Sequence, residues 1–308
     1  MPLSLFLLLI LKILPLYLVI ALGFLAGKFL NVNKESIARL LIYIISPAVI
    51  FHSVLTTELS LSVLSLPLLF FLCGCSLALF TLAIARHFWH DSTKNLLAFT
   101  AGTGNTGYFG LPVAIALFGP GISGLVVIAN LGLVLYENTL GFFITARGHH
   151  TVKASIVRVL KLPTIYAFLA AVLFNSLSVN LGTAYTELAV LFRGAYTILG
   201  MMLIGLALAS IKNFKLDIKF LSFAFLIKFL LWPVLILLLI TLDSSFTNFF
   251  SESIYKIMIL LSIAPLAANT VSFATELNAH PEKASFAVLM STLFALFYIP
   301  VFAVFFLM

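Results

Sequence analysis

Charged residues are scarce in this sequence. Only 9% of its 308 residues are Asp, Glu, Lys or Arg, whereas 63% are hydrophobic. Soluble globular domains carry about 25% charged residues and roughly 45–50% apolar ones. A chain with so little charge cannot cover itself with water-compatible side chains, which excludes a soluble globular domain. The composition therefore predicts an integral membrane protein.

Cysteine is nearly absent, and the residue patterns of an intramembrane enzyme are missing. Cys73 and Cys75 share one apolar run, FFLCGCSLALF, too close together to crosslink separate elements. Neither has a neighbouring His or acid, so we interpret both as inert buried thiols. There is no H-E-x-x-H pair and no Ser-His or paired-Asp constellation within an apolar stretch. We expect no catalytic residue, no metal site and no bound cofactor.

The net charge of +7 raises the alternative of a nucleic-acid partner. Such a partner needs basic residues gathered on one exposed face. Here the Lys and Arg residues fall instead in short gaps between apolar runs. We expect no nucleic acid and interpret the basic gaps as loops beside membrane lipid.

Apolar stretches long enough to span a membrane recur along the whole chain. A spanning helix needs about 20 mostly apolar residues. Ten stretches qualify, at 4–27, 35–55, 62–85, 95–118, 121–145, 154–176, 184–210, 218–241, 253–277 and 283–307. Because the gaps between them are short, we predict a single integral membrane domain over residues 1–308.

The basic residues also predict the orientation of the spans. Lys and Arg are retained on the cytoplasmic side of a membrane. They gather in alternate gaps, at Lys28, Lys34, Arg39, Arg86, Lys94, Arg147, Lys153, Arg158, Lys161, Lys212, Lys215, Lys219 and Lys283. We therefore expect a multi-pass protein of the cell (inner) membrane with both termini on the extracytoplasmic side.

Ten spans divide into two sets of five that enter the membrane from opposite sides. Such halves form an inverted repeat, which we place at residues 1–146 and 153–308 with a cytoplasmic connector at 147–152. The fourth span of the first half contains AGTGNTGYFGLP, and that of the second half contains SIAPLAANTVSF. Both carry an Asn-Thr pair near a proline. The prediction is an all-α membrane protein of two inverted five-helix repeats, with spans 4 and 9 broken and crossed.

The glycine-rich stretch of span 4 cannot remain an ordinary helix. Each Gly in a helix costs about 1 kcal/mol relative to Ala, and Pro about 3 kcal/mol. A broken backbone survives at membrane depth only where protein or a water-lined cavity satisfies its freed N–H and C=O groups. We therefore expect an internal crossing of the two breaks. The residues expected to shape it are Gly104, Gly110, Pro112 and Pro265.

Two opposed helix breaks form a site for an anion. The half-helix N-termini that meet at the crossing carry partial positive charge and unpaired N–H donors. Candidate substrate contacts are Asn105, Thr106, Gly107, Asn269, Thr270 and Ser272. Two structural alternatives stay open, because the Asn side chains could pair with neighbouring backbone and the hydroxyls could bond back to their own helices.

A dinucleotide site is the competing interpretation of GTGNTG at 102–107. That fingerprint requires a preceding strand and an acidic residue about 20 positions further on. Here an apolar helical stretch precedes the glycines, and the next acid, Glu137, lies about 30 residues beyond them in another span. The dinucleotide reading is rejected.

Two ionisable residues lie deep within predicted spans. An unpaired charge at that depth is costly and usually marks a functional site. Glu137 is either a proton carrier or the structural partner of a buried cation. Lys228 is either a counter-charge for the substrate or part of a salt bridge inside the bundle.

Several motifs together resemble the auxin efflux carrier family. They are LLIYIISPAVIF (40–51), NTGYFGLPVAIALFG (105–119), KLPTIYAFL (161–169) and APLAANTVSFATELNAHPEKASFAVLMSTLFALFYIP (264–300). This family of ten-span secondary carriers includes plant auxin exporters and bacterial carriers of malate or malonate. The short connector resembles the bacterial members. Residues 62–85 lack the Asp and Lys of the plant auxin carriers, which argues against auxin as the substrate.

The resemblance implies a fold similar to that of bile-acid and sodium–proton carriers. It implies an elevator-like mechanism in which a moving unit slides against a scaffold of spans 1, 2, 6 and 7, through which a homodimer could form. It also implies that the region of Ser46 lines the substrate cavity.

The function expected from the sequence is secondary transport of a small organic anion, a mono- or dicarboxylate, by alternating access. The residues do not distinguish coupling to H⁺ from coupling to Na⁺. An anion channel or a membrane sensor with the same fold is the alternative.

Overall fold

The computed structural model describes residues 2–146, 157, 160–210, 217–277 and 279–306, and within these ranges all regular structure is helical. Seven helical stretches are long and apolar enough to cross a membrane. They are Ser4–Phe29, Lys34–Leu55, Leu61–Ala85, Pro120–Thr145, Gly182–Ala209, Ile218–Phe246 and Pro281–Phe306. A multi-pass, all-helical protein is thereby confirmed.

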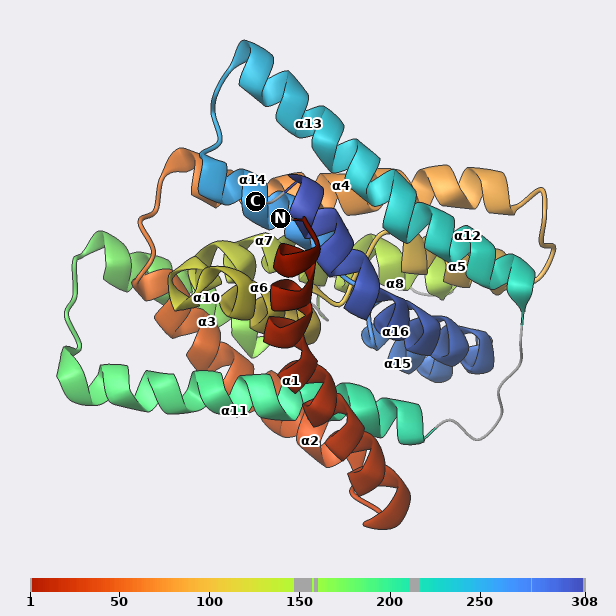
Figure 1. Ribbon diagram of the computed structural model, residues 1–308, viewed down its shortest axis with the longest axis horizontal. Coiled ribbons are helices and arrows are strands. Elements are labelled where there is room, and N and C mark those ends of the chain that lie inside the picture. Colours follow the sequence, from red (N-terminus) through yellow and green to blue (C-terminus); the bar gives the residue numbers. More distant parts are fainter. Residues whose placement is uncertain (1, 147–156, 158–159, 211–216, 278, 307–308) are drawn as a thin grey trace.

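The first half of the chain contains α1 to α8 with four interspersed segments of other helix type (Figure 1). The elements are α1 (Pro2–Phe29), α2 (Lys34–Leu40), η1 (Leu41–Ile45), α3 (Ser46–Leu55), α4 (Leu61–Ala85), α5 (Thr93–Ala101), η2 (Thr106–Gly110), α6 (Leu111–Phe118), η3 (Pro120–Ile122), α7 (Ser123–Tyr136), η4 (Glu137–Gly141) and α8 (Phe142–Thr145).

The second half begins, in the described residues, with the shorter apolar helix α10. Its elements are α10 (Pro163–Ser176), α11 (Gly182–Ala209), α12 (Ile218–Leu226), η5 (Ile227–Leu231), α13 (Trp232–Phe246), α14 (Glu252–Ser262), α15 (Asn269–Glu276) and α16 (Pro281–Phe306). The predicted connector at 147–152 lies outside the described residues. So do five of the residues that predicted the orientation, namely Arg147, Lys153, Arg158, Lys212 and Lys215.

Two of the predicted spans are interrupted rather than continuous. Residues 102–105, here called the first break, separate α5 from η2, and residues 263–268, the second break, separate α14 from α15. The backbone carbonyls at the end of α5 are buried and accept hydrogen bonds from side chains. Trp232 Nε1 donates to the Ala101 carbonyl over 2.7 Å, and the Tyr136 hydroxyl donates to those of Ala98 and Phe99. These side chains meet the hydrogen-bonding needs of a helix that ends inside the protein.

Three of the π-helical segments end two residues before a proline. Pro47 follows η1, Pro112 follows η2 and Pro233 follows η5. A proline has no N–H for the helical bond, and its ring clashes with the carbonyl four residues earlier. Widening the preceding turn relieves that clash, so local backbone chemistry explains where these segments lie. Such segments are frequent at functional sites.

The helices fall into two groups. In the first helix group, α1 packs along α11, and α3 packs against α10 and α11. In the second, α4 packs against α5 and α7, and α15 packs against α16. Figure 1 shows α1 crossing α11. Helix α1 also contacts α16 of the second group. The two broken segments belong to the second group.

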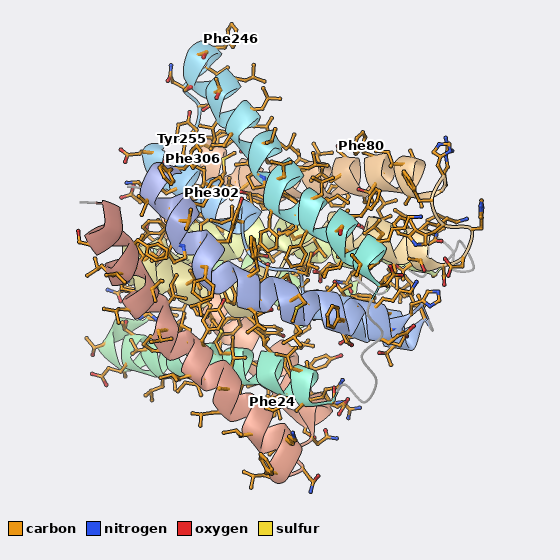
Figure 2. The ribbon with its side chains drawn as sticks, turned by 45° about the vertical axis from the view of Figure 1, so that its right-hand side comes forward. Phe24, Phe80, Phe246, Tyr255, Phe302 and Phe306 are labelled. Atoms are coloured by element: carbon orange, nitrogen blue, oxygen red, sulfur yellow. The ribbon has the colours of Figure 1, made fainter. Side chains whose placement is uncertain are left out.

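The outer surface is apolar and aromatic. Figure 2 shows Phe80 and Phe246 projecting from α4 and α13, and both are exposed. Exposed large apolar side chains continue along α1, α10, α11 and α16. This surface suits lipid rather than water.

Candidate functional site

The two breaks touch through their backbones. The Asn105 N–H donates to the Pro265 carbonyl over 2.8 Å. Leu266, also in the second break, donates its N–H to Ser291 Oγ of α16 over 3.1 Å. Backbone groups freed by the interruptions are thus paired with each other and with a neighbouring helix. The crossing is therefore an internal contact that hydrogen bonds hold together.

A cavity of about 540 Å³ opens at this crossing. Its volume lies within the range of about 300–1,000 Å³ typical of small-molecule sites. Apolar side chains of α3, α7 and α11 form much of its wall, while polar groups come from α2, the first break, η2, α7, η4 and α15. The predicted site residues that line it are Ser46, Gly104, Asn105, Thr106, Gly107, Glu137, Asn269 and Ser272.

The remaining predicted site residues lie outside the cavity lining. Pro265 lies in the second break, Gly110 ends η2 and Pro112 is in α6, and their expected role in shaping the crossing stays a prediction. Thr270 is buried, and its hydroxyl has no hydrogen-bond partner in the described structure. Lys228 is also buried and does not line the cavity.

Glu137 connects both breaks. Its carboxylate accepts a hydrogen bond from the Thr103 hydroxyl in the first break. It also accepts one from Asn269 Nδ2, at the start of the helix after the second break, over 2.9 Å. Glu137 is only 4% exposed although it lines the cavity. A single carboxylate therefore holds donors from two segments far apart in the sequence.

Lys228 lies against the first break. A Cβ atom placed on Gly104 would be 2.4 Å from Lys228 Nζ and 3.5 Å from the Pro265 carbonyl oxygen, so a side chain at this position would displace the ammonium from its present place. Nζ sits 4.9 Å from the centre of the Trp232 ring, and it has no hydrogen-bond partner in the described structure. The nearby C-terminus of α5 carries partial negative charge, which favours a cation here.

Asn130 and Tyr196 are cavity residues that the sequence interpretation missed. Asn130 Oδ1 accepts a hydrogen bond from the Thr106 hydroxyl over 2.5 Å. Asn130 precedes Glu137 by seven residues, two helical turns, so helical periodicity could have placed both on one face. Tyr196 comes from α11, and its hydroxyl would lie 3.1 Å from a Cβ on Gly107. No local sequence signal marks it, because its position depends on how the two helix groups pack.

The site offers an unpaired hydrogen-bond donor to a ligand. The Asn105 Nδ2 atom is buried and has no partner in the described structure, although Asn105 lines the cavity. A buried donor left unpaired is costly, and a ligand with acceptor atoms would satisfy it. Within the described ranges, no three His, Cys, Asp or Glu side chains gather in a way that could hold a metal ion.

Comparison with known proteins agrees with this architecture. The chain matches the sequence pattern of the family described as "Membrane transport protein" over residues 8–303. It is 27% identical over 277 residues to an "uncharacterized transporter" of Methanothermobacter thermautotrophicus, covering 88% of this chain and 89% of the relative. It is 25% identical over 220 residues to an "uncharacterized transporter" of Methanocaldococcus jannaschii, covering 67% of this chain and 71% of the relative. The family match spans nearly the whole sequence, and the chain therefore belongs to the membrane transport proteins of the auxin efflux carrier family.

Proposed function

We propose that this protein is a secondary transporter that carries a small organic anion, a mono- or dicarboxylate, by alternating access. The observation that supports this most directly is the crossing itself. Two interrupted helices are hydrogen-bonded from Asn105 to Pro265, and residues of both line one cavity of about 540 Å³. Broken helices at membrane depth are the usual substrate sites of secondary carriers.

The donors at the crossing favour a negatively charged ligand. The helix after each break begins there, at Thr106 and at Asn269, and helix N-termini carry partial positive charge. The unpartnered Asn105 amide adds a further donor beside the cavity. Lys228 supplies positive charge from behind the first break, so we propose that it acts through the break rather than by direct contact.

The arrangement of the helices supports an elevator-like movement. The cavity is lined by α2, η1, α3 and α11 of the first helix group and by the broken segments of the second. In the proposed mechanism the second group slides along the first and carries the site with it. An Asn-Thr pair marks the start of the helix after each break, as an inverted repeat of two five-span halves would place it.

The cavity reaches residues near the basic gaps. Its lining includes Lys34 and Glu35, at the start of α2, and Lys161, just before α10. Because basic gaps are cytoplasmic, we propose that this conformation opens to the cytoplasm of a cell membrane, with both termini on the other side.

Counterflow in proteoliposomes tests the proposal. Vesicles loaded with malonate, malate, butyrate or benzoate are diluted into the same radiolabelled compound, and accumulation of label reports exchange. We expect at least one carboxylate to exchange, and Asn105→Ala and Asn269→Ala to slow that exchange tenfold or more. Asn180→Ala, at an exposed position outside the cavity, is the matched control.

The same vesicles separate a carrier from a channel or sensor. The rate of transport by a carrier saturates with substrate concentration and is accelerated by substrate on the opposite side of the membrane. Flux through a channel shows neither property. Exchange at the parental rate in both Asn variants would disprove the site assignment, and absence of exchange for every carboxylate would disprove the function.

A further inference from the structure

Glu137 places an acidic group inside the proposed anion site. It lies at the start of the π-helical segment η4, within the stretch Pro120–Thr145, and it lines the cavity. Because it is nearly fully buried, its charge is poorly screened by water. An anion bound at the crossing would therefore lie in the same cavity as an acidic side chain.

Ionised Glu137 engages a donor that an anion would need. Asn269 is exposed to the cavity and stands at the N-terminus of α15, yet its Nδ2 donates to the Glu137 carboxylate over 2.9 Å. Thr103, from the first break, donates to the other carboxylate oxygen. Ionised Glu137 thus engages the Asn269 donor, which would otherwise be available to a substrate carboxylate.

No cation within the described ranges neutralises this carboxylate. Among the described residues, no Lys, Arg or His nitrogen lies within 4.0 Å of it. Lys228 sits against Gly104 and the Trp232 ring and is not part of the cavity lining. The titratable groups that face Glu137 are the phenols of Tyr108 and Tyr136, and neither supplies positive charge.

Two negative charges close together repel strongly where one of them is buried and poorly screened by water. A proton bound to Glu137 removes one of them and frees Asn269 to donate to the substrate. We infer that Glu137 is the proton-binding residue of the carrier, so that one proton enters the site with each anion and leaves when the anion leaves. The inference rests on the proposed anion transport and names its coupling ion.

The surroundings of Glu137 favour a proton over a sodium ion. Sodium sites in carriers are built from carbonyl and side-chain oxygens that accept the cation. Both oxygens of Glu137 instead face donor hydrogens, from the Thr103 hydroxyl and the Asn269 amide. A proton needs only one carboxylate oxygen, and it leaves the other free to accept from its donor.

Uptake driven by a pH gradient tests the inference. Proteoliposomes with an internal pH of 7.5 are placed at external pH 5.5 or 7.5, with the membrane potential clamped by valinomycin and potassium. The probe is whichever of malonate, malate, butyrate and benzoate the parent exchanges. We expect uptake at least fivefold faster with the gradient, together with internal acidification reported by trapped pyranine.

Three variants assign the proton to its residue. Glu137→Gln should lose the gradient stimulation and the acidification, whereas Glu137→Asp, which remains titratable, should keep part of both. Glu252→Gln alters an exposed acid that pairs with Lys256 outside the cavity, and it should behave like the parent. Gel filtration in detergent checks that each variant is folded.

The outcomes separate failure of the inference from failure of the proposed function. Exchange without gradient stimulation, or stimulation by a sodium gradient alone, would overturn proton coupling and leave the anion carrier intact. Full stimulation in Glu137→Gln would overturn the role of this residue. No exchange of any probe at any pH would overturn both.

Discussion

The side-chain amide of Asn269 donates a hydrogen bond to the carboxylate of Glu137 over 2.9 Å, across 132 positions of sequence. The bond joins the helix that follows the second break to the long stretch that contains η4. Thr103 extends the connection to the first break. The crossing is therefore held by side chains as well as by the backbone bond between the breaks.

This bond predicts that Asn269 and Glu137 contribute to stability as a pair. Contacting residues in one hydrogen-bond network show interaction energies of about 0.5–3 kcal/mol. We expect Asn269→Ala, Glu137→Ala and the double variant to show a coupling of about 1 kcal/mol or more in the free energy of unfolding. SDS titration in mixed micelles measures it. Additive single effects, within about 0.5 kcal/mol, would contradict the pairing.

A side chain at position 102 is predicted to destabilise the protein. A Cβ at this position would lie 2.1 Å from Cζ of Tyr136, whose ring is fully buried and whose hydroxyl is bonded to α5. Because the ring cannot swing away, we expect Gly102→Ala to lower the free energy of unfolding by about 1–3 kcal/mol. Gly194→Ala is the control, since a Cβ there has nothing within 4 Å, and it should be neutral or stabilising. Equal stability of the two variants would refute the close approach of Tyr136.

Lys228 is predicted to destabilise the folded protein and to be required for fast anion exchange. It is buried, and its ammonium has no hydrogen-bond partner in the described part of the chain. Met has a similar length and no charge, so Lys228→Met should raise the melting temperature in detergent while slowing anion exchange at least tenfold. Lys256→Met, at an exposed surface pair, should change neither. A variant with unchanged exchange would show that Lys228 is only structural.

Asp217 is predicted to stabilise the protein in a pH-dependent way. Burial opposes ionisation of its carboxyl, but hydrogen bonds from Lys283 and from the Phe220 N–H outweigh it and lower the pKa of Asp217. A lowered folded-state pKa gives stability that is present above the ordinary Asp pKa of about 3.9 and is lost as the pH falls through the folded value.

The matching experiment compares Asp217→Asn with the parent. Asn is also a good N-cap, so the change mainly removes the charge that faces Lys283. We expect the variant to unfold more easily at pH 7 by about 1–3 kcal/mol, and the difference to shrink below pH 4. A constant difference from pH 7 to pH 3 would show that the carboxylate charge plays no part.

Local chemistry made much of the fold predictable. The apolar runs predicted the membrane helices, and the glycines at 102–110 with Pro112 predicted the first break, since those residues weaken any helix that contains them. The second break was less evident, because only Pro265 and a matching Asn-Thr pair marked it. Both breaks are present at the predicted places.

The partners at the site were less predictable. Glu137 and Lys228 stood out in the sequence as charges at membrane depth, with a salt bridge inside the bundle among the interpretations of Lys228. The structure instead gives each its own surroundings, with Glu137 bonded to Asn269 and Lys228 packed on Trp232. Tyr196 entered the cavity from α11 without any local signal.

The sequence alone determined that the chain is a helical membrane protein and where two of its helices are interrupted, because hydropathy and backbone propensity are properties of short segments. Only the tertiary structure decided which helices face one another. Side-chain pairs such as Asn269 with Glu137 depend on the packing of segments that are distant in sequence, and local propensity contains no information about that packing.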